Sequence, residues 1–293
     1  MSQEFRYYDL QLKKSSTNIE IVFPRWKHND ENIVIFSPHD DDFILGAGYI
    51  LLAALRSGAK VYIVIFNDGS AGYSQIKLKE EIIKTRKLET LNALKILGIE
   101  EDQIIRFNIP DFSGIHYLGW KFPWKKEDNR ESEGLFSKVI STLRKIKASR
   151  LVFPNGYREH IDHTAVYLSA MFDGPQVGDS VIIDYGEPSE IHTFLQYSVW
   201  SKFSPENSIL KKRDTRIRAN KAISVNKEIE DIICEALKQF KTQKEIVSNI
   251  MDVRKERKME NSERFIELYL NIDPRPQFDY NPYKKLISEI DLK

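Results

Sequence analysis

A histidine and three consecutive aspartates follow a short apolar run in the segment SPHDDDFILGAG, residues 37–48. Adjacent like charges repel one another unless a positive group holds them together. His39 and Asp42 are three residues apart, so both can face one divalent cation from a tight turn while Asp41 points elsewhere. The aspartates could instead cap the N-terminus of a following helix. A cap needs only one aspartate, so the segment raises the hypothesis of a metal site but leaves capping open.

A second histidine group occurs in GYREHIDHTAV, residues 156–166, again directly after an apolar run. His160 and His163 are three residues apart and share a face if a helix begins here. The competing interpretation is that Asp162 caps this helix and the imidazoles lie at the surface. His39, His160 and His163 are half of the six histidines in the chain. Together the two motifs offer two imidazoles and a carboxylate, with a histidine and an acid to spare, which is typical of a catalytic zinc site with one open position.

The elements around these motifs alternate between short apolar runs and longer amphipathic stretches. Strands are expected over residues 33–36, 60–69, 104–111 and 150–155, and helices over 44–55, 79–99 and 134–149. The strands are almost continuously apolar, as in a parallel sheet that helices cover on both faces. The sequence therefore predicts an α/β fold with a Rossmann-like, doubly wound, mostly parallel sheet. Both motifs would lie at the carboxyl ends of strands, where such sheets bind ligands.

The last third of the chain has a different character. From about residue 205 to 293 the pattern is helical and highly charged, with its clearest helix over residues 226–250. No stretch rich in Gly, Ser or Pro separates this region from the core at about 30–204. We therefore expect residues 1–293 to form a single domain with an integral helical C-terminal extension.

The composition narrows the classes of partner. The 44 lysines and arginines nearly balance 43 acids, giving a net charge of +1, which does not predict a nucleic-acid or membrane-surface partner. The apolar runs are too short to span a bilayer, and the charged N-terminus lacks a signal-peptide core. The single cysteine, Cys234, cannot form an internal disulfide, which suits a reducing compartment. We expect a cytoplasmic protein that acts on a small molecule, and the oligomeric state stays open.

The segments HDDDFILGAG, NDGSAG, RKLETLNALKILGI, IPD and HIDHTAV follow one another between about residues 30 and 170. In order and spacing they resemble the PIG-L/LmbE-like family of metal-dependent N-deacetylases, whose two main motifs commonly read HPDDExLGxGG and HPDH. The resemblance implies a hydrolase that removes an acetyl group from the nitrogen of an N-acetylglucosamine-type amino sugar. It implies Zn²⁺ as the cofactor, with Fe²⁺ or another divalent metal as the alternative.

The resemblance also implies roles for the residues at matching positions. His39, Asp42 and His163 would bind the metal. Asp41 would act as the general base, and His160 would stabilise charge or donate a proton.

Three further residues receive expected roles. The resemblance implies that Arg86 contacts the substrate and that Asp111 holds sugar hydroxyls. A competing view pairs Arg86 with Glu89 within a helix. Asp162 is expected to orient one imidazole by accepting its second ring proton.

Two positions depart from the family motif. Asp40 stands where the family has proline, and Phe43 stands where it has glutamate. The first change adds an acid beside the site, and the second removes a residue that supports the loop. Neither alters the His-x-Asp-Asp spacing, and Asp40 has no predicted role.

Other classes of function are weighed against this one. A set of two histidines and one aspartate also suits a non-haem Fe(II) oxygenase, although Asp41 beside the site argues against it. A non-catalytic carbohydrate-binding protein could keep the same pocket. The aromatic loop at residues 111–129, which contains Phe112, Trp120 and Trp124, either lines a sugar site or packs on the core.

Overall fold

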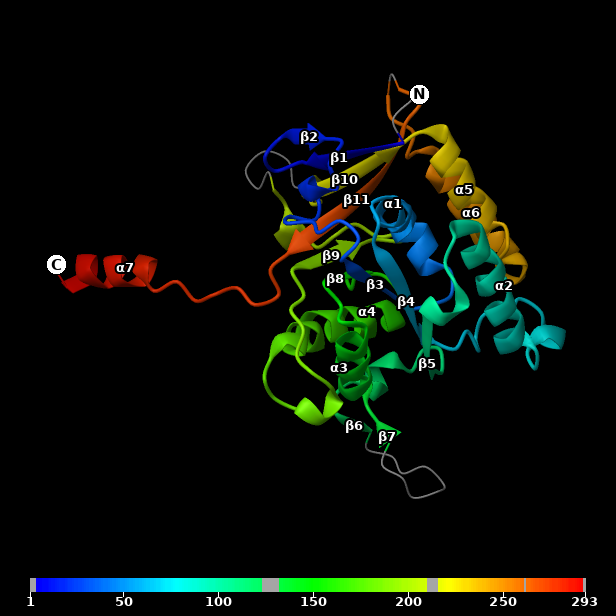
Figure 1. The fold of residues 1–293 in the computed structure, drawn as a ribbon, viewed down its shortest axis with the longest axis horizontal. Coiled ribbons are helices and arrows are strands. Elements are labelled where there is room, and N and C mark those ends of the chain that lie inside the picture. The colour runs from blue at the N-terminus through cyan, green and yellow to red at the C-terminus, as the bar shows by residue number, and fades with distance from the viewer. Residues whose placement is uncertain (1–3, 123–131, 210–215, 261, 292–293) are drawn as a thin grey trace.

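The computed structural model describes residues 4–122, 132–209, 216–260 and 262–291 (Figure 1). The strands are β1 (Phe5–Asp9), β2 (Lys14–Ser16), β3 (Asn32–Ser37), β4 (Lys60–Asn67), β5 (Ile104–Ile109), β6 (Lys121–Phe122), β7 (Ser132–Glu133), β8 (Arg150–Pro154), β9 (Thr193–Tyr197), β10 (Lys221–Val225) and β11 (Phe265–Ile272). The α-helices are α1 (Asp42–Arg56), α2 (Ile82–Leu97), α3 (Leu135–Ile146), α4 (Ile161–Leu168), α5 (Lys227–Leu237), α6 (Lys244–Lys255) and α7 (Asn281–Asp291). Within these ranges, one sheet has the strand order β2-β1-β10-β11-β9-β8-β3-β4-β5, and β6 pairs with β7 separately.

One half of the sheet is parallel; its strands β3, β4, β5 and β8 agree with the predicted strands, whereas β9 was not predicted. This half runs from β9 through β8, β3 and β4 to β5. In β3, Ile33 and Ile35 pack with α1, α2 and α5 on one face, whereas Val34 and Phe36 pack with α3 and α4 on the other. Helices therefore cover both faces (Figure 1), which explains why these strands are apolar along their whole length.

The prediction of a mostly parallel sheet is wrong for the other half. There β11 pairs antiparallel with β9 and β10, and β1 pairs antiparallel with β10 and β2. The α/β class holds, but the sheet as a whole is mixed. The antiparallel strands were not predicted because charged residues interrupt their apolar pattern. Glu267, for example, lies within β11 and accepts a hydrogen bond from Arg257 (2.7 Å).

The region expected to be a helical extension also differs from its prediction. It contributes β10 and β11 to the main sheet, besides α5, α6 and α7. The single helix expected over residues 226–250 is two helices, α5 and α6, because the chain leaves the helical path between Leu237 and Lys244. In the part of the chain that the structure describes, we find no helix long and apolar enough to cross a membrane.

Candidate functional site

The two histidine motifs meet because β3 and β8 are neighbours in the sheet. His39 follows β3, Asp42 begins α1, and His163 lies in the first turn of α4. Asp42 Oδ2 is 3.1 Å from His39 Nδ1 and 3.1 Å from His163 Nε2. Each of the three residues offers one ligand atom, and these atoms lie within 4.8 Å of one another. The structure thus brings together the three residues that were expected to bind a metal.

The chemistry of this cluster fits a divalent metal ion. His163 is fully buried, and its Nε2 makes no hydrogen bond although it faces Asp42. A buried polar atom without a partner is unfavourable, and a cation among the three ligand atoms would satisfy it. Two imidazole nitrogens and one carboxylate oxygen are a donor set that suits Zn²⁺ with an open coordination position.

The charges of the cluster are strongly coupled. Burial alone would raise the pKa of Asp42, but His163 and His39 hold it well below its usual value. Burial alone would lower the pKa of His163, yet the neighbouring Asp42 carboxylate raises it to about 9. The aspartate therefore favours a positive charge at this point, whether a proton or a metal ion carries it.

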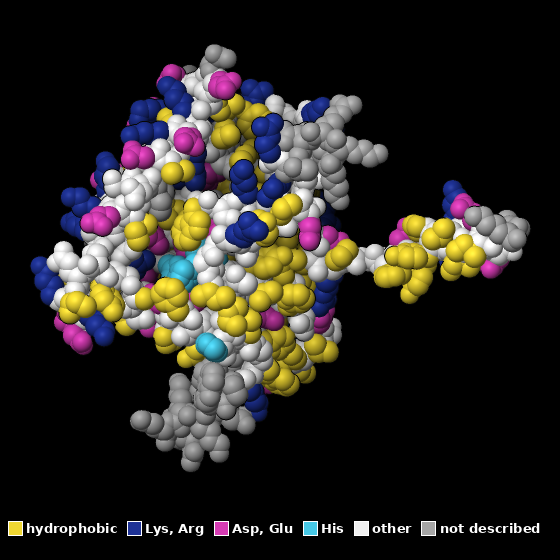
Figure 2. Space-filling model, turned by 180° about the vertical axis from the view of Figure 1, so that it is seen from behind, with side chains coloured by type: hydrophobic (Ala, Val, Ile, Leu, Met, Phe, Trp, Pro, Cys, Tyr) yellow, Lys and Arg dark blue, Asp and Glu magenta, His cyan; other side chains and the backbone are white. Residues whose placement is uncertain are grey.

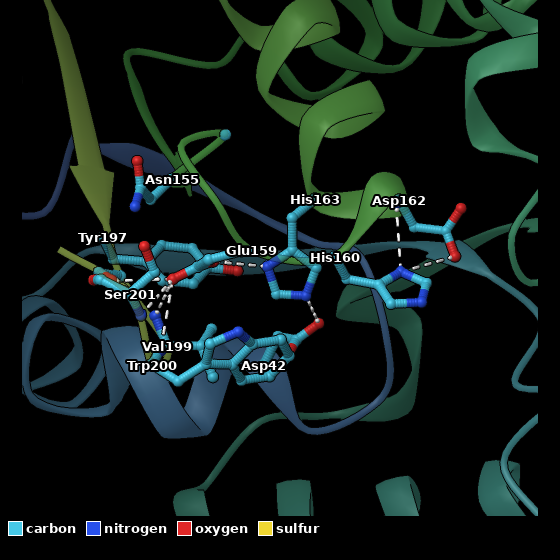
Figure 3. Close-up of polar contacts among 12 residues, drawn as sticks. Asp42, Asn155, Glu159, His160, Asp162, His163, Tyr197, Val199, Trp200 and Ser201 are labelled. Carbon is cyan, nitrogen blue, oxygen red and sulfur yellow. Dashed lines mark hydrogen bonds and ion pairs between the residues drawn. The ribbon is translucent and has the colours of Figure 1, made fainter. Parts of the chain in front are cut away.

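Glu159 was missed by the sequence analysis, although it fixes the orientation of His163 (Figure 3). Its Oε2 lies 2.7 Å from His163 Nδ1, and its Oε1 accepts hydrogen bonds from Ser198 Oγ and from the backbone N–H groups of residues 199–201. Figure 3 shows Glu159 and Asp42 at opposite nitrogens of the imidazole. A proton on Nδ1 leaves the Nε2 lone pair facing Asp42. The i, i+4 spacing of Glu159 and His163 is the sequence signal that could have found it.

Asp162 lies where an orienting carboxylate was expected, at the second ring nitrogen of His39 (3.2 Å). It also accepts hydrogen bonds from the backbone N–H groups of Phe112 (2.8 Å) and Gly114 (3.2 Å). Burial alone would raise the pKa of Asp162, but its contacts with His160 and His39 and its hydrogen bonds from the backbone lower it. His39, His160 and Asp162 form a second cluster of possible ligands. However, the Asp162 carboxylate already accepts hydrogen bonds from two backbone N–H groups, which leaves it less available to a metal ion.

The capping interpretation explains neither motif. Asp41 precedes α1, but its side chain makes no capping hydrogen bond. Asp42 accepts a hydrogen bond from the backbone N–H of His39 (2.9 Å). At the start of α4 the cap is His160, whose Nδ1 accepts a hydrogen bond from the backbone N–H of Asp162 (3.2 Å).

Asp40, which had no predicted role, is fully buried among three donors. It accepts hydrogen bonds from Thr90 Oγ1 (2.6 Å), Arg106 Nη2 (2.5 Å) and Arg86 Nε (3.2 Å). Burial alone would raise the pKa of Asp40, but the two guanidinium groups lower it. Arg86 also reaches Asp41 Oδ1 from its Nη2 (3.4 Å). The acid in place of the family's proline therefore holds Arg86 beside Asp41.

Arg86 and Asp111 both contact the loop after β4. Gly69 in this loop has φ 77°, and a Cβ atom there would lie 2.8 Å from Arg86 Cδ. Asp111 accepts two backbone N–H bonds from the same loop, at 3.0 and 2.9 Å. The intrahelical pairing of Arg86 is not observed, because Glu89 instead accepts hydrogen bonds from Thr242.

A pocket of about 190 Å³ opens beside these side chains. Its lining includes most of the predicted site residues: His39, Asp41, Asp42, Arg86, Asp111 and His160. Two exposed rings also line it, with Phe112 4.4 Å from the His160 ring and Trp200 4.9 Å from the His163 ring. Figure 2 shows histidine side chains in a hollow with hydrophobic side chains around them.

Among the described residues of the aromatic loop, only some line this pocket. Phe112 lines it, whereas Trp120 packs against Phe136 and donates a hydrogen bond to Tyr185 Oη (3.0 Å). Trp124 lies outside the described residues. Phe43, at the other departure from the family motif, is buried in the core between α1 and the sheet.

Comparisons with known proteins agree with the motifs. Residues 34–171 match the family model described as PIG-L: GlcNAc-PI de-N-acetylase. The diacetylchitobiose deacetylase of Thermococcus kodakarensis is 20% identical over 165 residues, 55% of this chain and 55% of that protein. The chain thus matches little more than half the length of this curated relative.

Two solved structures share the fold over most of the chain. The N,N′-diacetylchitobiose deacetylase of Pyrococcus horikoshii has a TM-score of 0.62 at 15% identity, covering 87% of this chain and 90% of its own. The 4-carboxy-2-hydroxymuconate hydratase of Pseudomonas putida has a TM-score of 0.60 at 14% identity, covering 85% and 99%. Because their activities differ, these likenesses show the fold alone. Residues 34–171, just under half of the chain, match the PIG-L family model, in agreement with the motifs.

Proposed function

We propose that the protein is a metal-dependent N-deacetylase that removes the acetyl group of an N-acetylglucosamine-type sugar derivative. The observation that carries the proposal is the convergence of His39, Asp42 and His163 on one point, beside a pocket that contains the further carboxylate Asp41. The deacetylase relative among curated proteins favours this reaction class.

The three converging residues would hold Zn²⁺. When bound, the ion would lower the pKa of a water molecule and polarise the amide carbonyl. Glu159 and Asp162 would keep the two imidazoles in orientations that suit this task, because each accepts the second ring proton of one of them.

Asp41 is the proposed general base. It faces the pocket, and burial raises the pKa of its carboxyl, whereas the positive charge of Arg86 opposes the rise. A carboxylate in this setting accepts a proton from the attacking water more readily than an exposed aspartate does. It can then return the proton to the nitrogen of the leaving amine.

We propose that His160 stabilises the negative charge that develops on the carbonyl oxygen of the amide during the reaction. Its Nδ1 lies beside the backbone N–H of Asp162 (3.2 Å) and the carboxylate of the same residue (3.3 Å), so we assign its Nε2 as the N–H that faces the substrate. That N–H can donate to the carbonyl oxygen as the amide carbon becomes tetrahedral, or to the leaving amine. The Phe112 ring packs edge-on against this imidazole, with ring centroids 4.4 Å apart.

The same pocket suggests how a sugar is held. Arg86 and Asp111 line it, and we propose that they offer a donor and an acceptor to sugar hydroxyls. Phe112 and Trp200 flank it, and an aromatic ring can cover the apolar face of a sugar.

The test is acetate release from N-acetylglucosamine and N,N′-diacetylchitobiose by zinc-loaded protein, before and after chelation. Asp41→Asn should keep its zinc but lose turnover by ~10²-fold or more, whereas Glu80→Gln, a matched change at an exposed site, should behave as the wild type. Turnover that persists in Asp41→Asn would exclude the assigned base. Oxygen consumption with Fe²⁺, or sugar binding without turnover, would favour the oxygenase or the binding protein instead.

A further inference from the structure

The C-terminal helix α7 lies away from the body of the protein, at the end of an arm (Figure 1). Every residue from Asn281 to Asp291 is exposed. Tyr283, Leu286, Ile287 and Ile290 recur at spacings of three and four residues and so form one apolar face of the helix. Each of these side chains is 55–60% exposed. The helix therefore presents an apolar face that its own body does not cover.

Such a helix is not expected to be stable by itself. It has 11 residues, and isolated helices of this length are marginal in water. Its local support lies mainly at its start, where Phe278 stacks on Tyr283 with ring centroids 5.6 Å apart and Asp279 Oδ1 accepts a hydrogen bond from the backbone N–H of Asn281 (2.9 Å). Most of the stability of a short amphipathic helix comes from packing of its apolar face, so α7 needs a surface to pack on.

The arm directs this helix away from its own body. The connecting segment DPRPQFDY, residues 273–280, contains Pro274 and Pro276, which fix φ and favour an extended chain. At its foot, Arg275 donates two hydrogen bonds to Asp179, at 2.7 and 2.6 Å. The foot is thus fixed to the body, and the stiff segment carries α7 outward.

An apolar surface lies where the arm leaves the body. Phe172, Val181 and Ile183 are 66%, 54% and 71% exposed, and Asp179, which holds the arm, lies among them in sequence. We refer to Phe172, Val181 and Ile183 as the foot patch. Figure 2 shows hydrophobic side chains gathered on the body near the foot of the arm. A groove of about 330 Å³, partly lined by Arg275, adjoins this foot.

We propose that α7 packs on the foot patch of a second copy of this chain, so that two copies exchange their arms. Each copy carries both an apolar helix and an apolar patch, so the helix of one copy can pack on the patch of the other. A two-fold axis makes this contact twice and closes the assembly. A membrane surface matches α7 less well, because Lys284 and Lys285 are balanced by Glu289 and Asp291, whereas helices that lie on membranes have a basic polar face. The proposal does not depend on the catalytic function.

Sedimentation of the full chain at about 10 µM, a concentration at which a nanomolar interface would be saturated, tests the exchange. The wild type should contain an even number of chains, and Leu286→Glu and Ile183→Glu should each halve its mass. Ser288→Glu adds the same charge to the polar face of α7 and should leave the mass unchanged. All three positions lie on α7 or in the exposed foot patch, so circular dichroism should show folded protein in each variant.

A mixture of the Leu286→Glu and Ile183→Glu variants gives the sharper result. In a mixed dimer, the intact arm of the Ile183→Glu chain meets the intact patch of the Leu286→Glu chain. The mixture should therefore contain associated protein that neither variant forms alone. A monomeric wild type, a mass that Leu286→Glu does not change, or a mixture that stays dissociated would overturn the proposal. So would flotation of the wild type, but not of Leu286→Glu, with phosphatidylcholine–phosphatidylserine vesicles.

Discussion

Replacing Glu159 with glutamine tests how His163, a proposed metal ligand, is oriented. The carboxylate faces Nδ1 with Oε2, and its Oε1 is occupied by four other donors, from Ser198 Oγ and the backbone of residues 199–201. An amide has one oxygen, and these four donors would hold it. The NH₂ group would then face Nδ1, which favours the tautomer with its proton on Nε2. That is the nitrogen that must be free to bind a metal.

Loss of such a partner typically weakens metal binding by 10–100-fold, or about 1.4–2.7 kcal/mol. Titration of Zn²⁺ against a competing chromophoric chelator measures the Kd directly. Ser198→Ala is the matched control, because it removes one donor to Glu159 but leaves the contact with His163; its Kd should change by well under tenfold. An unchanged Kd in Glu159→Gln, or an equal loss in both variants, would refute this account of the tautomer.

Three further perturbations test other parts of the site and fold. His163→Ala should remove most of the bound metal by elemental analysis, whereas His160→Ala should retain it; the reverse pattern would contradict the ligand set. Asp40→Asn removes the charge between the buried guanidinium of Arg86 and the half-buried one of Arg106. It should lower the unfolding free energy by about 3 kcal/mol, seen as an earlier midpoint in urea, and an unchanged midpoint would be inconsistent with that role. Burial raises the pKa of Asp173 from its usual 3.8 to about 7, so its contribution to stability is fully present below pH 3.8 and is lost as the pH rises through about 7. The wild type should therefore lose about 2 kcal/mol between about pH 5.5 and pH 8, and Asp173→Asn should not, so parallel pH profiles would disprove the shift.

In the parallel half of the sheet, β3, β4, β5 and β8 could be predicted because each has a local signal, whereas β9 was not predicted. Strand β3, for example, is apolar on both faces from Ile33 to Phe36. The antiparallel half has no comparable signal. Phe5 pairs with Val225 across most of the chain, and β11 tolerates Glu267 because Arg257 and Arg254 lie beside it. Pairings at such separation leave no periodic pattern in the segments that form them.

The same distinction applies to the site. The spacing within each histidine motif is local, so the clustering of the predicted ligands could be anticipated. Asp40 could not be understood from its segment, because Arg86 and Arg106 come from 46 and 66 residues further along the chain. Glu159 stands next to His160 in sequence, but the turn that satisfies its second oxygen follows about 40 residues later, between Ser198 and residue 201.

The pocket is built from two distant stretches of the chain, and this has a consequence for how its selectivity can change. Residues 34–171 contain His39, Asp42 and His163, whereas Gln243 and Ile246, at the start of α6, supply part of the outer wall. Gln243 joins the stretches by donating a hydrogen bond to the carbonyl oxygen of Gly72. Mutations in α6 can therefore reshape the space for a substrate while the inner ligands keep their geometry. Changes in α6 can thus alter which substrate the pocket accepts while His39, Asp42 and His163 stay in place, so α6 is the place to begin when redirecting the pocket toward another substrate.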